Sequence, residues 1–156
     1  DLVMAIKFGM ILAAFLFLKR MSDIANVRQW VDKSDSDEYA LNSDFKAVPK
    51  NTIVYEIFGA LFFGATKDLL NIVNKEGKNV LILRMRNVPA MDISGLEALE
   101  ELLGICKKRN MTLILSHVNE QPIKVMEKAG FIEKAGRENF CESIDKALER
   151  ARTLDK

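Results

Sequence analysis

The sequence predicts an α/β domain with a mixed central sheet whose middle strands are parallel. Helices flank the sheet on at least one face, and a further helix precedes the domain at the N-terminus. Two observations support this prediction. After about residue 52, short apolar runs of strand length alternate with segments whose apolar residues recur at helical spacing, which is typical of parallel strands joined by helices. Residues 2–18 instead form a single long run that is apolar except for one lysine.

The N-terminal run Leu2–Leu18 is apolar except for Lys7. As a helix it would be about 26 Å long, slightly shorter than a hydrocarbon core of about 30 Å. Lys19 and Arg20 follow immediately and Arg28 comes a little later, so the positive-inside rule predicts that the downstream residues lie in the cytoplasm. The run therefore reads as most of a membrane-spanning helix. A secretory signal peptide and a buried helix of a globular core are the alternatives.

Residues 31–51 separate this helix from the domain. Acidic residues outnumber lysines there, and most of the segment shows no apolar periodicity, so we expect a solvated linker. The acidic residues are Asp32, Asp35, Asp37, Glu38 and Asp44, and the lysines before Pro49 are Lys33 and Lys46. The expected organisation is the end of a transmembrane helix at 1–20, a juxtamembrane helix end and acidic linker at 21–51, and a folded domain at 52–156.

The domain opens with two β-prone apolar segments, Ile53–Phe58 and Ala60–Phe63, which are separated by Gly59. We expect them to form a bent strand or a hairpin, followed by a helix from Thr66 to Val73. The next apolar run, Val80–Leu83, is bulky and continuous rather than alternating, which predicts a central strand that is buried on both faces.

A strongly amphipathic helix follows that strand. Its glutamates lie near the start and its basic residues near the end, which complements the helix dipole. The apolar positions are Leu96, Leu99, Leu102, Leu103 and Cys106; the charged ones are Glu97, Glu100, Glu101, Lys107, Lys108 and Arg109.

The rest of the chain repeats the strand and helix alternation. Asn110 is a plausible left-handed cap before a buried strand at Met111–Leu115. Pro122 suits the first turn of the next helix, which Gly130 ends. A last helix presents one apolar face, made of Ile144, Ala147, Leu148 and Ala151.

The most specific motif of the chain is DISGL at residues 92–96, where the central strand gives way to the amphipathic helix. This motif resembles the core of the STAS domain, in which a strand ends in a turn of the form Asp-x-Ser/Thr-Gly-Leu. Bacterial anti-sigma-factor antagonists and the cytoplasmic tails of SulP (sulfate permease) anion transporters share that domain. Val48–Leu70 is similar to the opening hairpin and first helix of the transporter version, and Leu113–Phe131 to the next strand and helix. The resemblance covers about two thirds of the chain and implies a STAS-type sheet.

The first 20 residues look like the last transmembrane helix of a SulP transporter, which leads directly into a cytoplasmic STAS domain. The resemblance thus implies part of a longer protein in the cell inner membrane, with the STAS domain in the cytoplasm. Its implied role is that of a regulatory or interaction domain, neither an enzyme nor the transport path, of a transporter of inorganic anions such as sulfate or bicarbonate, or of dicarboxylates. The implied partners are the membrane domain of the same transporter, the lipid bilayer through the N-terminal helix, and a second copy or a cytosolic protein.

The turn formed by Asp92, Ser94 and Gly95 is the candidate functional site. In the resembled antagonists the hydroxyl at the position of Ser94 can be a phosphorylation site. Free amides at a helix start, together with the glycine, suit a phosphate or another anion. The structural alternative is a capping box in which Ser94 and Glu97 each satisfy an unpaired amide. Ile93 replaces a second small hydroxyl residue that many antagonists carry, which weakens the case for kinase recognition.

Two other functional classes stay open at this point. One is a soluble partner-switching antagonist that is phosphorylated at the Ser94 turn, and the other is a nucleotide-binding sensor that takes a phosphate after Gly95. Neither needs a cofactor, and we expect none.

Composition excludes several classes of function. A formal charge of +1 gives no signature of nucleic-acid binding. Cys106 and Cys141, both on predicted helices, and the lone His117 lack partners at metal-ligand spacing, so we expect no metal and a reducing compartment. Gly59 and Gly64 lie in apolar surroundings that indicate a strand bend rather than a phosphate loop.

Overall fold

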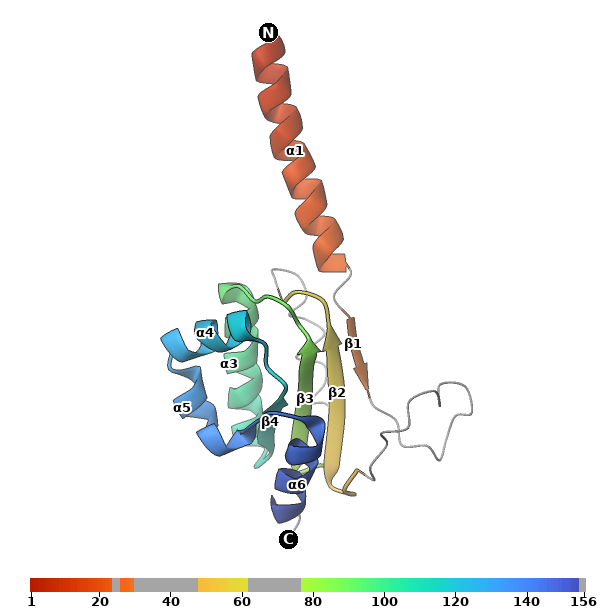
Figure 1. Ribbon diagram of the computed structural model, residues 1–156, viewed down its shortest axis with the longest axis vertical. Helices are drawn as coiled ribbons and strands as arrows, with labels where there is room; N and C mark the ends of the chain where they lie inside the picture. Colours follow the sequence, from red (N-terminus) through yellow and green to blue (C-terminus); the bar gives the residue numbers. More distant parts are fainter. Residues whose placement is uncertain (24–25, 30–47, 62–76, 155–156) are drawn as a thin grey trace, which may run out of the picture.

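A computed structural model describes residues 1–23, 26–29, 48–61 and 77–154 of the protein. A long helix, α1 (Leu2–Asp23), extends away from a domain built around one sheet (Figure 1). Strands and helices alternate along the domain and the sheet is mixed, so the predicted fold class is confirmed.

The sheet contains five strands in the order β1-β2-β3-β4-β5. They are β1 (Asn26–Gln29), β2 (Thr52–Phe58), β3 (Val80–Asn87), β4 (Thr112–Ser116) and β5 (Phe140–Cys141). β1 runs antiparallel to β2, and every later pair of neighbours is parallel. The parallel middle of the sheet agrees with the prediction.

β3 is the central strand, and its first four residues are at most 1% exposed. Alternate side chains of this run enter two separate cores: Leu81 and Leu83 pack on one side of the sheet, and Val80 and Ile82 on the other. This confirms that the continuous apolar run belongs to a strand buried on both faces.

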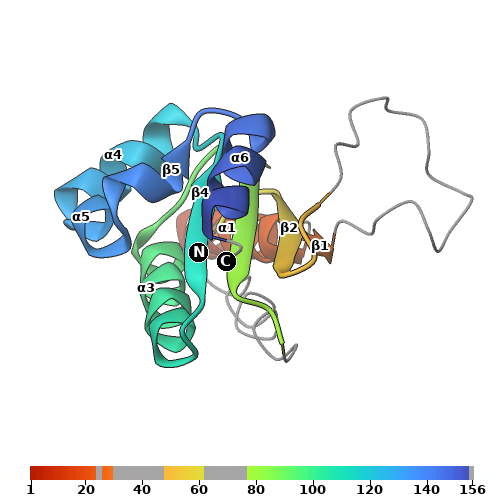
Figure 2. The ribbon, with the colours of Figure 1, turned by 90° about the horizontal axis from the view of Figure 1, so that it is seen from below.

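In the described part of the domain, four helices and a short 3-10 turn accompany the sheet. They are α3 (Ile93–Lys108), α4 (Glu120–Lys128), α5 (Phe131–Ala135), the 3-10 turn η2 (Arg137–Asn139) and α6 (Ile144–Leu154). Figure 2 shows α3, α4 and α5 together on one side of the strands, with α6 apart from them.

The order of the strands explains this arrangement of helices. β3, β4 and β5 are added to the sheet in one direction, so right-handed crossovers place the connecting helices on the same face. α6 follows the last strand and covers the opposite face with its predicted apolar stripe, of which Ala147, Leu148 and Ala151 are buried.

Local sequence signals are also confirmed. Asn110 adopts a left-handed backbone with φ 55° after α3, and Gly130 does so with φ 67° after α4. Pro122 lies in the first turn of α4, where its missing amide costs no helical hydrogen bond.

Three features differ from the predictions. The hairpin between residues 53–58 and 60–63 is wrong, because β1 and β3 occupy both edges of β2. β1 itself lies in the segment assigned to the juxtamembrane region and linker and was not foreseen. Cys141 is in β5 rather than in a helix. The helix expected at Thr66–Val73 lies outside the described residues.

α1 makes the N-terminal run an exposed helix. Residues 1–20 are all exposed, and Leu2–Met21 forms one 20-residue apolar span with a mean hydropathy of 2.1. The alternative of a buried helix in a globular core is therefore wrong, because none of this span is buried against the domain.

Candidate functional site

Asp92 is the N-cap of α3. Its backbone is extended (φ −101°, ψ −174°), and its carboxylate Oδ1 accepts a hydrogen bond from the Gly95 amide at 2.9 Å. The backbone oxygen of Asp92 also accepts a hydrogen bond from the amide of Leu96 at 3.1 Å. The predicted capping box of Ser94 and Glu97 is thus wrong, because the helix begins at Ile93 and Ser94 already lies inside its first turn.

Gly95 is required by close packing against the backbone of a distant segment. A Cβ atom at this position would overlap the carbonyl oxygen of Leu61 and the side chain of Met91. Leu61 also forms an isolated parallel bridge with Met91 and accepts a hydrogen bond from the Asp92 amide at 3.2 Å. The close approach expected at Gly95 is therefore present, but it is made by the backbone of Leu61 and not by an anion.

Two side-chain amides from the start of α4 hold the loop that leads into the turn. Asn119 donates to the carbonyl oxygens of Arg86 at 3.0 Å and of Val88 at 2.7 Å. Gln121 accepts from the Met91 amide at 2.8 Å and donates to the Met91 carbonyl at 3.0 Å. We call these two residues the amide clamp. It fixes the backbone immediately before Asp92.

The turn presents two side chains outward. Ile93 is 63% exposed, and outside α1 it is the only large hydrophobic residue with an exposed side chain in the described part of the domain. Ser94 next to it is half-buried, and so is Asp92, whose carboxylate is engaged in the cap. Because that carboxylate already occupies the Gly95 amide, one of the free amides that favoured an anion is taken.

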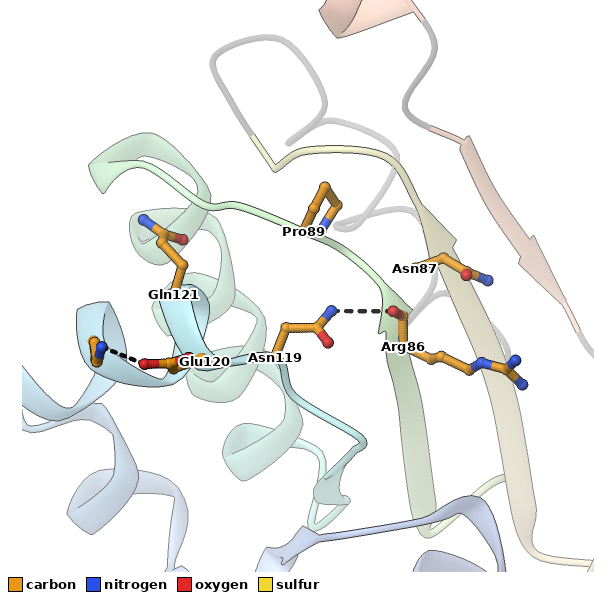
Figure 3. A pocket seen from close by; sticks show the side chains of 7 residues that line it. Arg86, Asn87, Pro89, Asn119, Glu120 and Gln121 are labelled. Carbon is orange, nitrogen blue, oxygen red and sulfur yellow. Dashed lines mark hydrogen bonds and ion pairs between the residues drawn. The ribbon is translucent and has the colours of Figure 1, made fainter.

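A shallow depression of about 750 Å³ lies beside the amide clamp (Figure 3). Its lining is polar and of mixed charge, and it combines the end of β3 with the start of α4. The lining residues are Arg86, Asn87, Pro89, Asn119, Glu120, Gln121 and Lys124. Lys124 is ion-paired with Glu120 across one helical turn, so the positive charge on that side of the depression is balanced.

The turn lies at the carboxyl ends of β2 and β3, which is also the end of the sheet nearest to α1. Asn26, three residues after the last residue of α1, pairs with Phe58, and Phe58 pairs with Asn87 at the end of β3. The loop to Asp92 starts there, and Figure 1 shows α1 leaving the domain at this end. The basic group Lys107, Lys108 and Arg109 lies at the opposite end of α3.

The cysteines stand apart from this turn. Burial raises the pKa of the Cys106 thiol to about 11, although the nearby Arg109 lowers it in part. Burial also raises the pKa of Cys141. Both thiols are free and protonated at neutral pH, as expected of small packed side chains and not of reactive groups.

Sequence reasoning singled out Asp92, Ser94 and Gly95 as the candidate site but missed the residues that hold this turn in place. Asn119 directly before a helix would be read as an ordinary N-cap. In the structure its side chain makes no cap and turns to the β3 carbonyls instead. Nothing in the local sequence pairs Gln121 with Met91, because the two are 30 residues apart.

The chain was compared with known proteins. Residues 46–147 match the model of the STAS domain family. A structure described as a sulfate transporter family protein from Wolinella succinogenes is 41% identical, with a TM-score of 0.66; the match covers 70% of this chain and 91% of that one. The STAS domain of a SulP transporter from Vibrio cholerae is 30% identical with a TM-score of 0.61, over 69% of this chain and 86% of that one.

A curated relative that is longer than this chain is similar to it over nearly the whole length of this chain. The putative sulfate transporter YvdB of Bacillus subtilis (strain 168) is 29% identical over 149 residues, which is 93% of this chain and 26% of the relative. The chain thus spans about a quarter of that transporter, and the alignment necessarily takes in part of α1, whose length and polarity fit the end of a transmembrane helix. With the family match across most of the sheet, these similarities show that the chain belongs to the STAS domain family and is homologous to the SulP sulfate transporters.

Proposed function

We propose that this chain is the cytoplasmic regulatory domain of a secondary anion transporter of the sulfate type, attached to the end of its last membrane helix. One observation carries the proposal: the exposed Ile93, with the half-buried Ser94 beside it, lies at the end of the domain from which α1 departs. The domain has no enzymatic role and does not form the transport path in this proposal. It acts on the membrane domain of the same transporter.

The proposed contact uses the turn as a fixed docking element. Ile93 supplies an apolar side chain that gains free energy when a partner covers it, and Ser94 supplies a hydroxyl beside it. The Asp92 cap, the Leu61 contact and the amide clamp hold the backbone in place before any partner arrives. A preorganised element loses little conformational freedom on docking, so a small surface can transmit a regulatory signal.

The proposed location is the cell inner membrane, with the sheet on the cytoplasmic side. Lys19 and Arg20 immediately follow the apolar span, which favours this orientation. The other partners that fit the exposed turn, a second copy of the domain or a cytosolic protein, compete for the same surface.

Uptake by the full parent transporter tests the proposal. Radiolabelled sulfate and bicarbonate uptake should be measured in cells that express the wild type, Ile93→Ser, Ser94→Ala, or a transporter truncated after Arg20, with membrane abundance measured in parallel. We expect truncation and Ile93→Ser to change uptake per transporter, and Ser94→Ala to reproduce part of the change. Glu97→Ala, an exposed change one turn further along α3, is the matched control.

Stability measurements separate docking from misfolding. Because Ile93 is mostly exposed, Ile93→Ser should change the free energy of unfolding by less than about 0.5 kcal/mol. Unchanged uptake per transporter in both the truncated protein and Ile93→Ser would contradict a regulatory role for the domain.

A further inference from the structure

One part of the sheet surface is not covered by the described helices. α6 packs on β3, β4 and β5, over the apolar residues near their amino ends. On the same side of the sheet, β1 and the carboxyl ends of β2 and β3 extend beyond α6. Figure 1 shows these ends directed toward α1. This surface lies next to the membrane if α1 spans the bilayer.

A row of charged side chains crosses that surface. Arg28 of β1 is the cross-strand partner of Glu56, and Glu56 is the partner of Arg84 in β3, so the three side chains share one face. Arg84 and Glu56 form an ion pair with Nη1 and Oε2 3.6 Å apart. Arg28 lies over the ring of Phe58, with its guanidinium carbon 5.4 Å from the ring centre.

Arg86 follows Arg84 by two residues in β3, so the alternation of side chains along a strand places it on the same side as Arg84. A bulge after Arg84 brings Asn87 to that side as well. β3 advances by three residues, from Arg84 to Asn87, while β2 advances by two, from Glu56 to Phe58. Such an extra residue turns neighbouring side chains to one side. Asn87 accordingly donates to Glu56 at 2.9 Å, and Figure 3 shows Arg86 and Asn87 extending the same way.

We define the basic face as Arg28, Arg84 and Arg86. Arg28 and Arg86 are exposed, whereas the Arg84 side chain is only 18% exposed. Glu56 is the acidic residue bonded within the row, and it is mostly buried beneath Arg84 and Asn87. The accessible charge on this face is therefore positive.

The chain keeps the basic face close to the end of α1. Arg28 is five residues beyond Asp23, so the two cannot be more than about 18 Å apart along an extended chain. Electrostatic attraction in physiological salt decays over about 8 Å, and Lys19 and Arg20 near the end of α1 add to the same positive field. A short rotation of the domain would bring both exposed arginines to a bilayer surface.

We propose that the basic face docks on the anionic phospholipid headgroups of the cytoplasmic leaflet and so sets the orientation of the domain against the membrane. Arg28 and Arg86 bind the headgroup phosphates, while Arg84 neutralises the Glu56 carboxylate beneath them through their ion pair. Guanidinium groups suit this role because they bind phosphate oxygens in a bidentate manner. The inference rests on the proposed function only in requiring that α1 spans the bilayer.

The full chain reconstituted in lipid nanodiscs allows a direct test. Trp30, the single tryptophan, follows Arg28 by two residues and can serve as the energy donor to a dansyl-labelled lipid. Transfer should be compared in nanodiscs of phosphatidylcholine alone and of phosphatidylcholine mixed with phosphatidylglycerol. We expect higher transfer in the anionic nanodiscs, and we expect added salt to remove the difference.

Charge variants identify the residues responsible. Arg28→Gln and Arg86→Gln should each lower the ratio of docked to undocked domain by about fivefold, and by about 25-fold together, since one basic residue near an anionic surface contributes roughly a factor of five. Arg28→Lys keeps the charge and should retain most of the docking. Lys107→Gln with Lys108→Gln, at the other end of the domain, is the control with equal loss of charge and should leave the ratio unchanged.

Each outcome has one meaning. Equal transfer in neutral and anionic nanodiscs overturns the inference and leaves a protein partner as the occupant of this face, while the membrane attachment of α1 stands. An equal loss of docking in the control variant also overturns it, because net charge would then be the cause. Transfer that is absent from every nanodisc shows that α1 does not enter the bilayer, and that result contradicts the proposed function itself.

Discussion

Substitutions of Asp92 and Ser94 distinguish the residue that caps α3 from the residue proposed to contact a partner. Asp92→Ala removes the carboxylate that satisfies the Gly95 amide and should lower the free energy of unfolding by about 1 kcal/mol. Ser94→Ala, inside the first helical turn, should change it by less than about 0.5 kcal/mol. Urea denaturation followed by circular dichroism measures both. A larger loss for Ser94→Ala than for Asp92→Ala would contradict the assignment of the cap.

Because burial raises the pKa of the Cys106 thiol, we expect the protein to lose stability in alkaline solution. Its folded pKa of about 11 lies above the ordinary value of 9.0, so below pH 9 both the folded and unfolded thiols are protonated and stability is unaffected. Between pH 9 and 11 the unfolded thiol ionises first, and the free energy of unfolding should fall by as much as about 2 to 3 kcal/mol. Urea titrations at several pH values measure this loss. Cys106→Ala lacks the thiol and should lose correspondingly less over the same range.

The candidate site combines a local sequence motif with contacts that only the folded chain creates. Asp92, Ser94 and Gly95 belong to a contiguous motif, so the local sequence was enough to propose them as the candidate site. Their roles depend on Leu61, Asn119 and Gln121, which are brought to the turn only by folding. Within this turn, the sequence pattern wrongly suggested Ser94 as the helix cap, whereas Asp92 is the N-cap of α3.

At the scale of elements, the amide clamp joins α4 to the loop between β3 and α3. Gln121→Ala removes both hydrogen bonds to Met91 and should speed hydrogen exchange of the Met91 amide by about fivefold to thirtyfold, which corresponds to about 1 to 2 kcal/mol. Amides of β4 should keep their protection. Exchange measured residue by residue with NMR checks this.

Lys124→Ala provides the matched control for the clamp. It changes the same helix one turn later, and its side chain is paired with Glu120 on the surface. Exchange at Met91 should not respond to it. If Lys124→Ala and Gln121→Ala accelerate Met91 equally, α4 is loosened as a whole and the clamp has no specific role.

Most elements were predictable because their signals are local. The continuous apolar run of β3, the amphipathic stripes of α3 and α6, and the left-handed residues Asn110 and Gly130 each identify an element by themselves. β1 was missed because a strand of four residues carries almost no periodicity. Its pairing with β2 across a long intervening segment is a tertiary property, and so is the bulge that turns Asn87 toward Glu56.

At the scale of the whole molecule, the exposed span of α1 predicts association in water. The full chain should need detergent or should form oligomers, whereas a chain that begins at residue 24 should be monomeric by light scattering, because it lacks the contiguous apolar surface. Persistent oligomers after this deletion would show that the domain itself associates.

Removing residues 1–30 gives a useful comparison with that deletion. It also removes β1 and leaves the edge of β2 without its strand partner. We expect this longer deletion to lower the thermal midpoint and to aggregate on heating, as exposed sheet edges pair readily. Equal thermal midpoints for the two deletions would show that β1 adds nothing to the stability of the domain.

The order of the strands also bears on how the protein is made. Each strand lies beside the one that precedes it in the chain, from β1 to β5. During synthesis α1 leaves the ribosome before the strands of the domain, and every later strand then meets a neighbour that has already emerged. The sheet can thus assemble strand by strand in the order of synthesis, starting at β1, because no early strand has to wait for a partner that is made later.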